Sequence, residues 1–493
     1  MKNYIIAIDQ STSATKAMLF DESCHLLARQ DREHKQHYPQ AGYVEHDAEE
    51  IYRNTVDVIR AVVGTTDVRE SNYTLCITNQ RETAVVWDKH SGRPIGGAVV
   101  WQDTRGAEIC RSLREAGHEA LVRKRSGLLI DPNFSASGIK WLLDNVGGAR
   151  EAARRGDLLM GTIDTWLVWK LTEGRVFATD TTNASRTMLF NIHTLDWDDD
   201  LLRLFDIPRQ MLAEVRPCDA LYGETTVEGT FGNPISIAGV LGDSHGALVG
   251  QMCFDEGTGK VTYGTGSSVM VNIGTRALPA PQGLVTSIGY TALGKTYYGY
   301  EGNIYSTGAT LKWMADQMML IDNPAATEAE ATSVADNGGV YVVPAFAGLG
   351  APWWRMNSKA GIVGMTFATS RAHIVRAALE SIAYQIKDLT DVMSSGIGGK
   401  VSEICADGGP TKNKFLMQFQ ADLLQSAVVC TEVEDASALG AVVMNGFARG
   451  VWKTFDDVRP LRRVRQRIEP KPENEQMKAL YEGWRMAVDR VTK

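Results

Sequence analysis

The stretch YIIAIDQSTSATKAMLF, residues Tyr4–Phe20, decides the fold. Tyr4–Ile8 is rich in aromatic and β-branched residues and predicts a buried strand, and Lys16–Phe20 predicts a second strand that pairs back on it. Between them lies a turn rich in hydroxyl groups, with Asp9 at its start and Lys16 at its end. The sequence therefore predicts a β-hairpin whose tip carries a carboxylate, several hydroxyls and an ammonium group.

Such a tip offers hydroxyls, backbone N–H groups and a positive charge to phosphate oxygens. Asp9 stands where a carboxylate would meet the magnesium ion that accompanies phosphates. The tip is not a P-loop, because the G-x-x-x-x-G-K-[ST] pattern is missing. An ordinary polar hairpin without a ligand is the alternative at this point.

Length and composition limit the class of protein. The 493 residues are too many for one core and predict two or three domains. The net charge of −8 argues against a broad nucleic-acid surface. Seven scattered cysteines without a C-x-x-C pair argue against a zinc site and for a reducing compartment. Because no apolar leader opens the sequence and no uncharged run is long enough to cross a bilayer, we expect a cytoplasmic protein without membrane insertion.

The opening hairpin has a counterpart later in the chain. Lys260–Ile273, KVTYGTGSSVMVNI, repeats the order of strand, turn and strand, with the turn at Gly264–Ser268. Two such hairpins, one in each half of the sequence, predict two related domains that close on one nucleotide.

Polar side chains follow a predicted strand in the first half. Tyr73–Thr78 predicts a strand, and Arg81 and Glu82 come shortly after it. Open α/β folds place ligands at such strand ends. A neighbouring arginine and glutamate offer both donors and acceptors, which suits a polyhydroxylated molecule. A surface ion pair is the alternative.

A carboxylate follows a second apolar strand. Within Ile235–Gly250, ISIAGVLGDSHGALVG, the strand ends at Gly242 and Asp243 stands at the junction with a helix of small residues. A carboxylate there is placed to accept a proton from a bound hydroxyl. His245 is a second possible base, or a hydrogen-bonded structural histidine.

Three further segments complete the expectations. Leu159–Thr172 is apolar with helical spacing and predicts a core helix. Thr181–Phe190 predicts a polar loop that runs into a strand. Val401–Ala406 predicts a strand before paired glycines, Gly408 and Gly409, which allow a ring or a phosphate to approach the backbone. A tight turn without a ligand explains the glycines equally well.

Together these motifs resemble those of the FGGY carbohydrate kinases, and within that family the chain is most similar to the glycerol kinase branch. The resemblance runs from Tyr4 to about Trp452. The segments that carry it are Ile77–Thr83 (ITNQRET), Thr182–Asp199 (TNASRTMLFNIHTLDWDD), Ala247–Phe254 (ALVGQMCF), Thr262–Gly266 (TYGTG), Tyr341–Trp354 (YVVPAFAGLGAPWW), Asp407–Gly409 (DGG) and Asn413–Leu424 (NKFLMQFQADLL).

The resemblance implies an α/β fold of two actin-like, ribonuclease H-like domains with an interdomain catalytic cleft. Residues 1–250 would form the acceptor-binding N-terminal domain, and residues 251–493 the nucleotide-binding C-terminal domain. Asp243 would be the catalytic base, and Asp9 and Asp243 would lie at the metal ion. The acceptor would be bound by Arg81, Glu82, Trp101, Asn133, Asp243 and Ser244. The nucleotide would be bound by Thr12, Ser13, Lys16, Thr265, Gly308, Gly409 and Asn413.

The sequence also departs from the glycerol kinases. Those enzymes place a tyrosine, a glutamine and a phenylalanine where this chain has Asn133, Ser244 and Ser268. Their signature lysine falls on Gly138, and a glutamine on the adenine side becomes Lys312. The first three changes replace larger side chains with smaller ones, which predicts a roomier and more polar acceptor pocket.

The sequence therefore predicts an ATP-dependent, magnesium-dependent kinase of a small polyol or sugar larger than glycerol, forming a homo-oligomer, most simply a dimer. A true glycerol kinase that makes glycerol 3-phosphate is the first alternative. A catalytically inactive nucleotide- or sugar-binding regulator and an actin-like ATPase are the others. The retained Asp9, Asp243 and Thr265 argue against the regulator, and an ATPase would give Arg81 and Glu82 no task.

Overall fold

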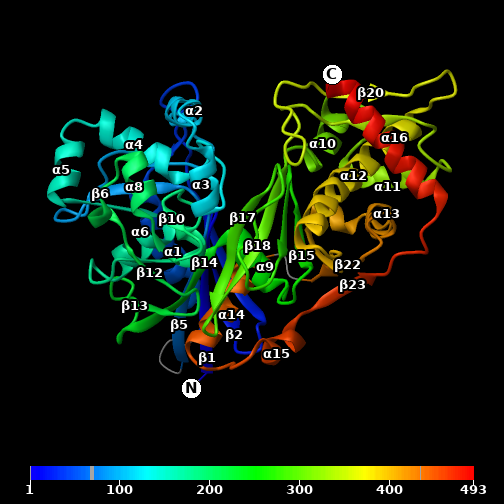
Figure 1. The fold of residues 1–493 in the computed structure, drawn as a ribbon. Helices are drawn as coiled ribbons and strands as arrows, with labels where there is room; N and C mark the ends of the chain where they lie inside the picture. The colour runs from blue at the N-terminus through cyan, green and yellow to red at the C-terminus, as the bar shows by residue number, and fades with distance from the viewer. Residues whose placement is uncertain (1, 67–70, 433–434, 493) are drawn as a thin grey trace.

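The computed structural model describes residues 2–66, 71–432 and 435–492. The chain forms two lobes, each built around a β-sheet (Figure 1). The sheet of the first lobe has the order β13-β14-β5-β1-β2-β3. Its strands are β1 (Lys2–Gln10), β2 (Ala14–Asp21), β3 (Leu26–Glu33), β5 (Ser71–Asn79), β13 (Leu221–Thr225) and β14 (Ile235–Gly242).

The sheet of the second lobe repeats this arrangement, in the order β17-β18-β16-β15-β21-β22-β23. Its strands are β15 (Thr258–Tyr263), β16 (Ser267–Asn272), β17 (Val285–Ala292), β18 (Lys295–Ile304), β21 (Glu403–Gly408), β22 (Ala427–Thr431) and β23 (Val464–Ile468). In the first sheet β1 pairs antiparallel with β2 and parallel with β5, and in the second β15 pairs antiparallel with β16 and parallel with β21. The predicted duplication of the hairpin is therefore confirmed.

Strand register brings distant polar residues to one edge of each sheet. In the first sheet Asn79 lies opposite Gln10 on one side and opposite Gly242 on the other. Because these three strands are parallel, the residues around their carboxyl ends lie together, as open α/β folds require of a ligand site. In the second sheet Tyr263 lies opposite Gly408, so the two glycine-containing turns that follow are neighbours.

Two helices pack against each other where the lobes meet. They are α9 (Asp243–Gly250) and α14 (Ala436–Ala448). A Cβ atom at Gly440 would lie 2.0 Å from the backbone oxygen of Gly246, so only glycine allows this approach. Residues of α9, α14 and both sheets share one buried apolar cluster. This close packing joins the lobes at their base and leaves their upper ends apart.

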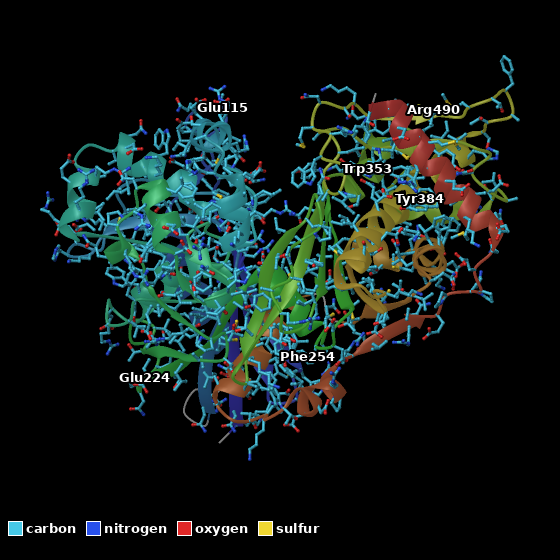
Figure 2. All side chains as sticks on the ribbon, viewed as in Figure 1. Glu115, Glu224, Phe254, Trp353, Tyr384 and Arg490 are labelled. Atoms are coloured by element: carbon cyan, nitrogen blue, oxygen red, sulfur yellow. The ribbon has the colours of Figure 1, made fainter. Side chains whose placement is uncertain are left out.

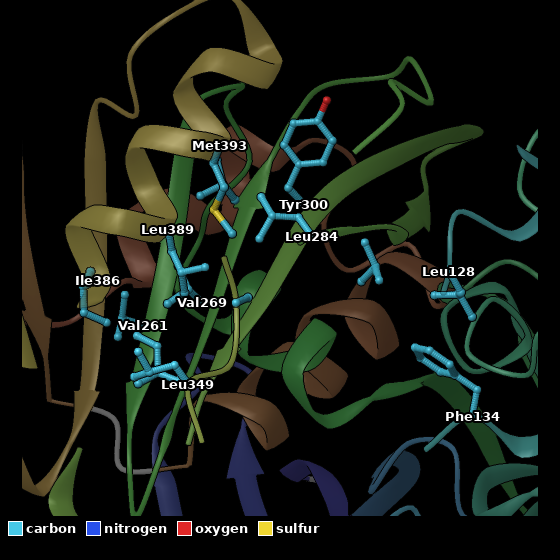
Figure 3. Packing of buried hydrophobic residues seen from close by; sticks show 14 of the residues in the cluster. Leu128, Phe134, Val261, Val269, Leu284, Tyr300, Leu349, Ile386, Leu389 and Met393 are labelled. Carbon is cyan, nitrogen blue, oxygen red and sulfur yellow. The ribbon is translucent and has the colours of Figure 1, made fainter. Parts of the chain in front are cut away.

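A long helix covers the second sheet. It is α12 (Arg371–Ile397), and Figure 3 shows its Ile386, Leu389 and Met393 against Val261 and Val269 of the sheet. The other helices of this lobe are α10 (Gly308–Asp316), α11 (Thr327–Thr332), α13 (Lys414–Leu424), α15 (Phe455–Val458) and α16 (Glu475–Thr492). The β19–β20 pair (Tyr341–Val343, Gly361–Val363) also belongs to it. Among the described residues no helix is both long and apolar enough to cross a membrane.

The first lobe carries an additional small sheet, β4-β7-β6-β8. Its strands are β4 (Glu45–His46), β6 (Ala84–Asp88), β7 (Ala98–Val99) and β8 (Leu158–Thr162). The helices of the lobe are α1 (Ala48–Val63), α2 (Ala107–Glu115), α3 (Glu119–Ser126), α4 (Ser135–Asn145), α5 (Ala149–Arg155), α6 (Ile163–Leu171), α7 (Thr181–Ala184) and α8 (Asp199–Phe205). The lobe is completed by four short strands, β9 (Ala178–Asp180), β10 (Phe190–Asn191), β11 (Asp196–Trp197) and β12 (Glu214–Arg216).

Two local predictions in this lobe are wrong, the second of them only in part, because Thr181–Phe190 does run into a strand, β10. Leu159–Thr172 is not one helix, because its first residues form β8 and only Ile163–Leu171 is helical. Both parts are almost entirely buried, and a fully buried apolar run carries no periodicity that separates strand from helix. The predicted loop at Thr181–Phe190 begins as the short helix α7, which the side chain of Asp180 caps.

Candidate active site

A cavity of about 870 Å³ lies between the lobes. Figure 2 shows Glu115 and Arg490 at the upper ends of the two lobes, on either side of the opening. The first lobe lines the cavity with Thr12, Arg81, Glu82, Trp101, Asn133 and Asp243 among others, and the second lobe with Thr265, Ser268 and Glu301. The structure thus brings the predicted base, the predicted acceptor residues other than Ser244 and a residue of each hairpin into one space.

Asp243 is the first residue of α9, directly after the end of β14. Its Oδ1 atom accepts a hydrogen bond of 2.6 Å from the backbone N–H of Ser244 and lies 3.2 Å from Nε of Arg81. Burial raises the pKa of this carboxyl, and the charge of Arg81 opposes that rise. The side chain is still 36% exposed, so a bound hydroxyl has access to it.

Glu82 sits in a strained backbone conformation. Its φ angle is +62°, in the left-handed region that residues other than glycine seldom adopt. The backbone oxygen of Glu82 accepts a hydrogen bond of 2.7 Å from Ser135, and its Oε1 atom lies 2.6 Å from Nε of Arg186. Such strain persists only where surrounding contacts enforce it, and it is typical of binding and catalytic sites.

Trp101 connects the acceptor residues with the first hairpin. Its indole Nε1 donates a hydrogen bond of 3.0 Å to Oγ1 of Thr12. The ring is 38% exposed and lines the cavity. An indole ring combines a large apolar surface with one N–H donor, so the part of Trp101 that faces the cavity can pack against the carbon atoms of a ligand.

The charged residues of the first hairpin are paired with each other and with α14. Nζ of Lys16 lies 2.8 Å from Oδ2 of Asp9 and 3.3 Å from Oδ1 of Asp435, the residue that precedes α14. Burial raises the pKa of Asp9 and Lys16 opposes it, while the pKa of Lys16 is raised because both carboxylates outweigh its own burial. The ion pair between Lys16 and Asp435 therefore connects the first hairpin to the start of α14 in the second lobe.

The second hairpin packs onto the start of α10. The backbone oxygen of Thr265 accepts bonds of 3.0 Å from the N–H groups of Thr307 and Ala309. A Cβ atom at Gly308 would lie 2.5 Å from the backbone oxygen of Gly264. Gly308 is thus explained by this close approach, with or without a nucleotide.

The remaining predicted nucleotide residues lie outside the cavity lining. A Cβ atom at Gly409 would meet no atom within 4 Å, so neighbouring protein does not explain that glycine. Asn413 caps α13, accepting a bond of 2.9 Å from the N–H of Leu416, and donates to Thr327 at 3.2 Å. Its side chain therefore has a structural task. Ser13 is exposed at the tip of the first hairpin.

Three charged residues at the cavity were missed in the sequence. Glu301 and Arg186 line the cavity, and their exposed fractions are only 1% and 2%. Lys260 is 1% exposed, and its Nζ donates to Oγ of Ser268 at 3.1 Å and to Oγ1 of Thr262 at 3.3 Å. An isolated charge within an apolar strand, as in KVTY and GYEGNI, is the signal that would have found Lys260 and Glu301.

His245 favours the structural alternative. It is completely buried, and its Nε2 atom lies 3.3 Å from Oγ of Ser287. Burial, with the nearby charge of Arg81, holds the pKa of the imidazole well below its usual value. Its low pKa favours a neutral ring that packs within the lobe.

Asp9 and Asp243 could bind a divalent cation that also has phosphate and water ligands, but they are too few to form a complete metal site. Within the described ranges no group of three or more histidine, cysteine, aspartate or glutamate side chains is arranged to hold a metal. Burial raises the pKa of both carboxyls, and the charge of Asp9 raises that of Asp243 further. A cation between them would relieve this repulsion. Magnesium usually keeps several waters and binds through one or two carboxylates and substrate phosphates.

Comparison with known proteins identifies the family. Residues 4–250 match the model of the FGGY family of carbohydrate kinases, N-terminal domain, and residues 259–449 match that of its C-terminal domain. The chain belongs to the FGGY family of carbohydrate kinases. It is therefore a phosphotransferase, and the predicted family and fold class are confirmed.

Relatives that match nearly the whole chain are named glycerol kinases. Glycerol kinase 2 of Thermotoga maritima is 47% identical over 488 residues, which cover 99% of this chain and 98% of the relative. A glycerol kinase of Pseudomonas putida is 46% identical over 491 residues, covering 99% and 97%. The crystal structure of Plasmodium falciparum glycerol kinase with ADP has a TM-score of 0.95 at 34% identity, covering 99% and 98%.

More distant structures share the fold alone. The xylulose kinase of Lactobacillus acidophilus, with ligand bound, has a TM-score of 0.89 at 19% identity and covers 99% of this chain and 97% of that one. The two-lobed arrangement of this kinase is thus common to relatives with different names, so the acceptor must be argued from the cavity itself.

Proposed function

We propose that this kinase transfers the terminal phosphoryl group of ATP to a primary hydroxyl of a small polyol, with glycerol as the first candidate acceptor. The observation that carries the proposal is the single cavity in which Asp243 meets Arg81, Glu82 and the two hairpin residues Thr12 and Thr265. The names of the most similar relatives favour glycerol, the alternative that the sequence left open, over a larger acceptor. The crystal structure of the Plasmodium enzyme with ADP supports an adenine nucleotide as the second ligand of this kinase.

In this mechanism the acceptor is bound by the first lobe. Arg81 and Glu82 bind its hydroxyls, and Trp101 covers its carbon edge. The attacking oxygen forms a bond to the γ-phosphorus, the bond from that phosphorus to the β-phosphate oxygen breaks, and the proton of the hydroxyl passes to Asp243. The short contact from the Ser244 N–H and the ion pair with Arg81 hold Oδ1 of Asp243 in place, so its other oxygen is left for the proton.

The nucleotide is held by both hairpins. Thr12, Ser13 and Lys16 would lie at the phosphates from the first lobe, and Thr265 from the second. Gly308, Gly409 and Asn413 would border the nucleotide, and the open space at Gly409 supports a close approach there. When bound, magnesium would supply charge neutralisation of the phosphates near Asp9 and Asp243. Closure of the lobes would exclude water and so prevent useless ATP hydrolysis.

A larger polyol or sugar, of four to six carbons, is the second candidate acceptor, and three side chains favour it. Asn133 and Ser268 line the cavity where the glycerol kinases have aromatic rings, and Oγ of Ser244 lies 3.4 Å from Oγ of Ser268. Because Ser268 accepts a hydrogen bond from Lys260, its own hydrogen is available to another oxygen. An additional acceptor hydroxyl could take that bond.

The proposal also includes the cellular location, the domain boundary and the oligomeric state of the enzyme. All seven cysteines are buried and unpaired, which supports a cytoplasmic, reducing location. A boundary between residues 250 and 251 and a homodimer remain predictions.

The test of the function is an ADP-release assay with ATP and magnesium across glycerol, longer polyols, ketoses and aldoses. Acceptor-dependent release supports the proposal, and the acceptor with the highest kcat/KM decides between the two candidates.

A further inference from the structure

A chain of alternating charges runs beneath the acceptor residues. Glu301, on β18 of the second sheet, lies between two arginines of the first lobe. Its Oε1 atom is 2.7 Å from Nη2 of Arg81, and its Oε2 atom is 2.7 Å from Nη1 of Arg186. Each arginine in turn reaches an acid of the active site, because Arg81 pairs with Asp243 and Arg186 with Glu82. One carboxylate thus supports both halves of the acceptor-binding pair.

The chain is buried deeply enough for its geometry to matter. The exposed fractions are 1% for Glu301, 2% for Arg186, 6% for Glu82 and 8% for Arg81. Burial opposes ionisation of Glu301, but Arg186 and Arg81 together hold its pKa well below the usual range. A charged carboxylate at this depth is stable only while both partners stay in contact with it, so it fixes the orientation of both guanidinium groups.

One nitrogen of Arg81 is buried without a hydrogen-bond partner in the described part of the protein. Nε is in ion-pair contact with Asp243 and Nη2 with Glu301, whereas Nη1 has no hydrogen-bond partner among the described residues. The two carboxylate oxygens of Glu301 also have no hydrogen-bond partner there, so the arginines hold Glu301 by charge. Arg81 lines the cavity. A buried donor without a partner costs free energy, and a hydroxyl oxygen of the acceptor would satisfy it.

Without Glu301, Arg81 would be free to turn both of its donors toward Asp243. The planar guanidinium group favours such a two-pronged pair with a carboxylate. That pair would withdraw Nη1 from the acceptor, and Arg186 would lose one of the two acids that hold it against Glu82. The distances therefore indicate that Glu301 competes with Asp243 for the guanidinium group of Arg81.

We propose that Glu301 is a positioning residue for acceptor binding, which holds Arg81 partly away from Asp243 and keeps Arg186 on Glu82. The inference rests on the proposed function, since it needs an acceptor in this cavity. Glu301 belongs to the second lobe and both arginines belong to the first. The affinity for the acceptor should therefore depend on the relative position of the two lobes.

Glu301→Gln tests the proposal, because it keeps the shape of the side chain and removes its charge. We expect the KM of the acceptor to rise about 10- to 100-fold, as for the loss of charged hydrogen bonds, while the KM of ATP changes less than about twofold. Glu301→Asp, which keeps the charge on a shorter side chain, should recover part of the loss. An unchanged acceptor KM in both variants would overturn the proposal.

Glu380→Gln is the matched control. Glu380 is also a completely buried acid of the second lobe, and its Oε1 atom lies 2.8 Å from Nε of Arg376. It lies outside the cavity lining, so its substitution should lower Tm without a selective change in acceptor KM. Equal changes in Tm and in both KM values for Glu301→Gln and Glu380→Gln would show that Glu301 is merely structural.

A second variant decides the question if Glu301→Gln does not fold. Arg186→Lys keeps the positive charge but cannot reach Glu82 and Glu301 at once. It should raise the acceptor KM selectively, and an unchanged KM would overturn the proposal. A wild-type enzyme that phosphorylates none of the acceptors would instead refute the proposed function, so the two failures are distinguishable.

Discussion

Nε of Arg81 lies 3.2 Å from Oδ1 of Asp243, although 162 positions separate the two residues in the sequence. Arg81 follows β5 and Asp243 follows β14, and the parallel pairing of these strands brings the two side chains together. In the proposed mechanism this pair places the proton acceptor, Asp243, next to a cation that binds the acceptor, Arg81.

Asp243→Asn should abolish most turnover without unfolding the protein. The amide oxygen can still accept from the Ser244 N–H and from Arg81, so the local structure persists. The amide cannot take the proton, and kcat should fall about 10²- to 10⁴-fold, the usual contribution of a general base. Steady-state kinetics measure the loss, with Tm and ADP binding as controls. Turnover close to that of the wild type would remove Asp243 from the mechanism.

Ser268→Phe should reduce the space for a longer acceptor. The ring would occupy the part of the cavity where Ser268 now presents its hydroxyl, and Lys260 would lose one of two hydroxyl partners. We expect kcat/KM for four-carbon polyols to fall about tenfold relative to glycerol, in line with the loss of one or two hydrogen bonds.

Ser268→Ala separates the two effects of that change, because it removes the hydroxyl without filling the cavity. A smaller fall in the same ratio would assign part of the preference to the hydrogen bond. If the ratio for four-carbon polyols over glycerol is the same in the wild type and both variants, Ser268 does not select the acceptor.

Gly308→Ala and Gly409→Ala should separate folding from nucleotide binding. At Gly308 the new methyl group would meet the backbone oxygen of Gly264 at 2.5 Å, so both Tm and the affinity for ATP should fall. At Gly409 the methyl group has open space in the protein. There we expect an unchanged Tm and an increased KM for ATP, because the methyl group would occupy the space of the nucleotide.

The two glycine variants are compared by thermal unfolding and by ATP titration in the ADP-release assay. A Gly409→Ala enzyme with the ATP affinity of the wild type would place the nucleotide away from this turn.

The fold could be predicted from the sequence where local pattern and register agree. The hairpin around Asp9 and Lys16 has apolar strands on both sides of a polar turn. The structure shows this hairpin in the first lobe and its counterpart, β15 and β16, in the second. The prediction of one core helix over Leu159–Thr172 is wrong, because the strand and the helix within this segment are almost equally buried.

The site was predicted less completely than the fold. Arg81, Glu82 and Asp243 could be predicted to lie at one cavity because each follows an apolar strand. Glu301 and Arg186 meet only across the two lobes, 115 positions apart, and no spacing in the sequence reports that contact. The charge cluster around the proposed acceptor residues can therefore be found only in the tertiary structure.

Asp388 should make stability depend on pH. Burial raises its pKa from 3.8 to about 6, although Tyr481, Trp484 and Trp353 donate hydrogen bonds to it. Between these two values the native state holds a proton that the unfolded chain has released. The free energy of unfolding should therefore fall as pH rises from about 4 to about 6, by up to about 3 kcal/mol from this group.

Asp388→Asn should flatten that dependence, because the amide does not titrate. Its oxygen can accept from both tryptophans and its NH₂ group can donate to the hydroxyl of Tyr481, so the contacts are retained. Urea unfolding at several pH values measures the slope. A variant that keeps the slope of the wild type would assign the pH dependence to other groups.

The central claim is that the enzyme transfers the terminal phosphoryl group of ATP to an alcohol bound in the cavity between the lobes. ADP release measured with ATP and magnesium, first without an acceptor and then with glycerol and with longer polyols, tests it most directly. The account predicts slow release alone and a large increase with at least one polyol, with one phosphate ester formed for each ADP. ATP hydrolysis at the same rate with and without every polyol and sugar would contradict it.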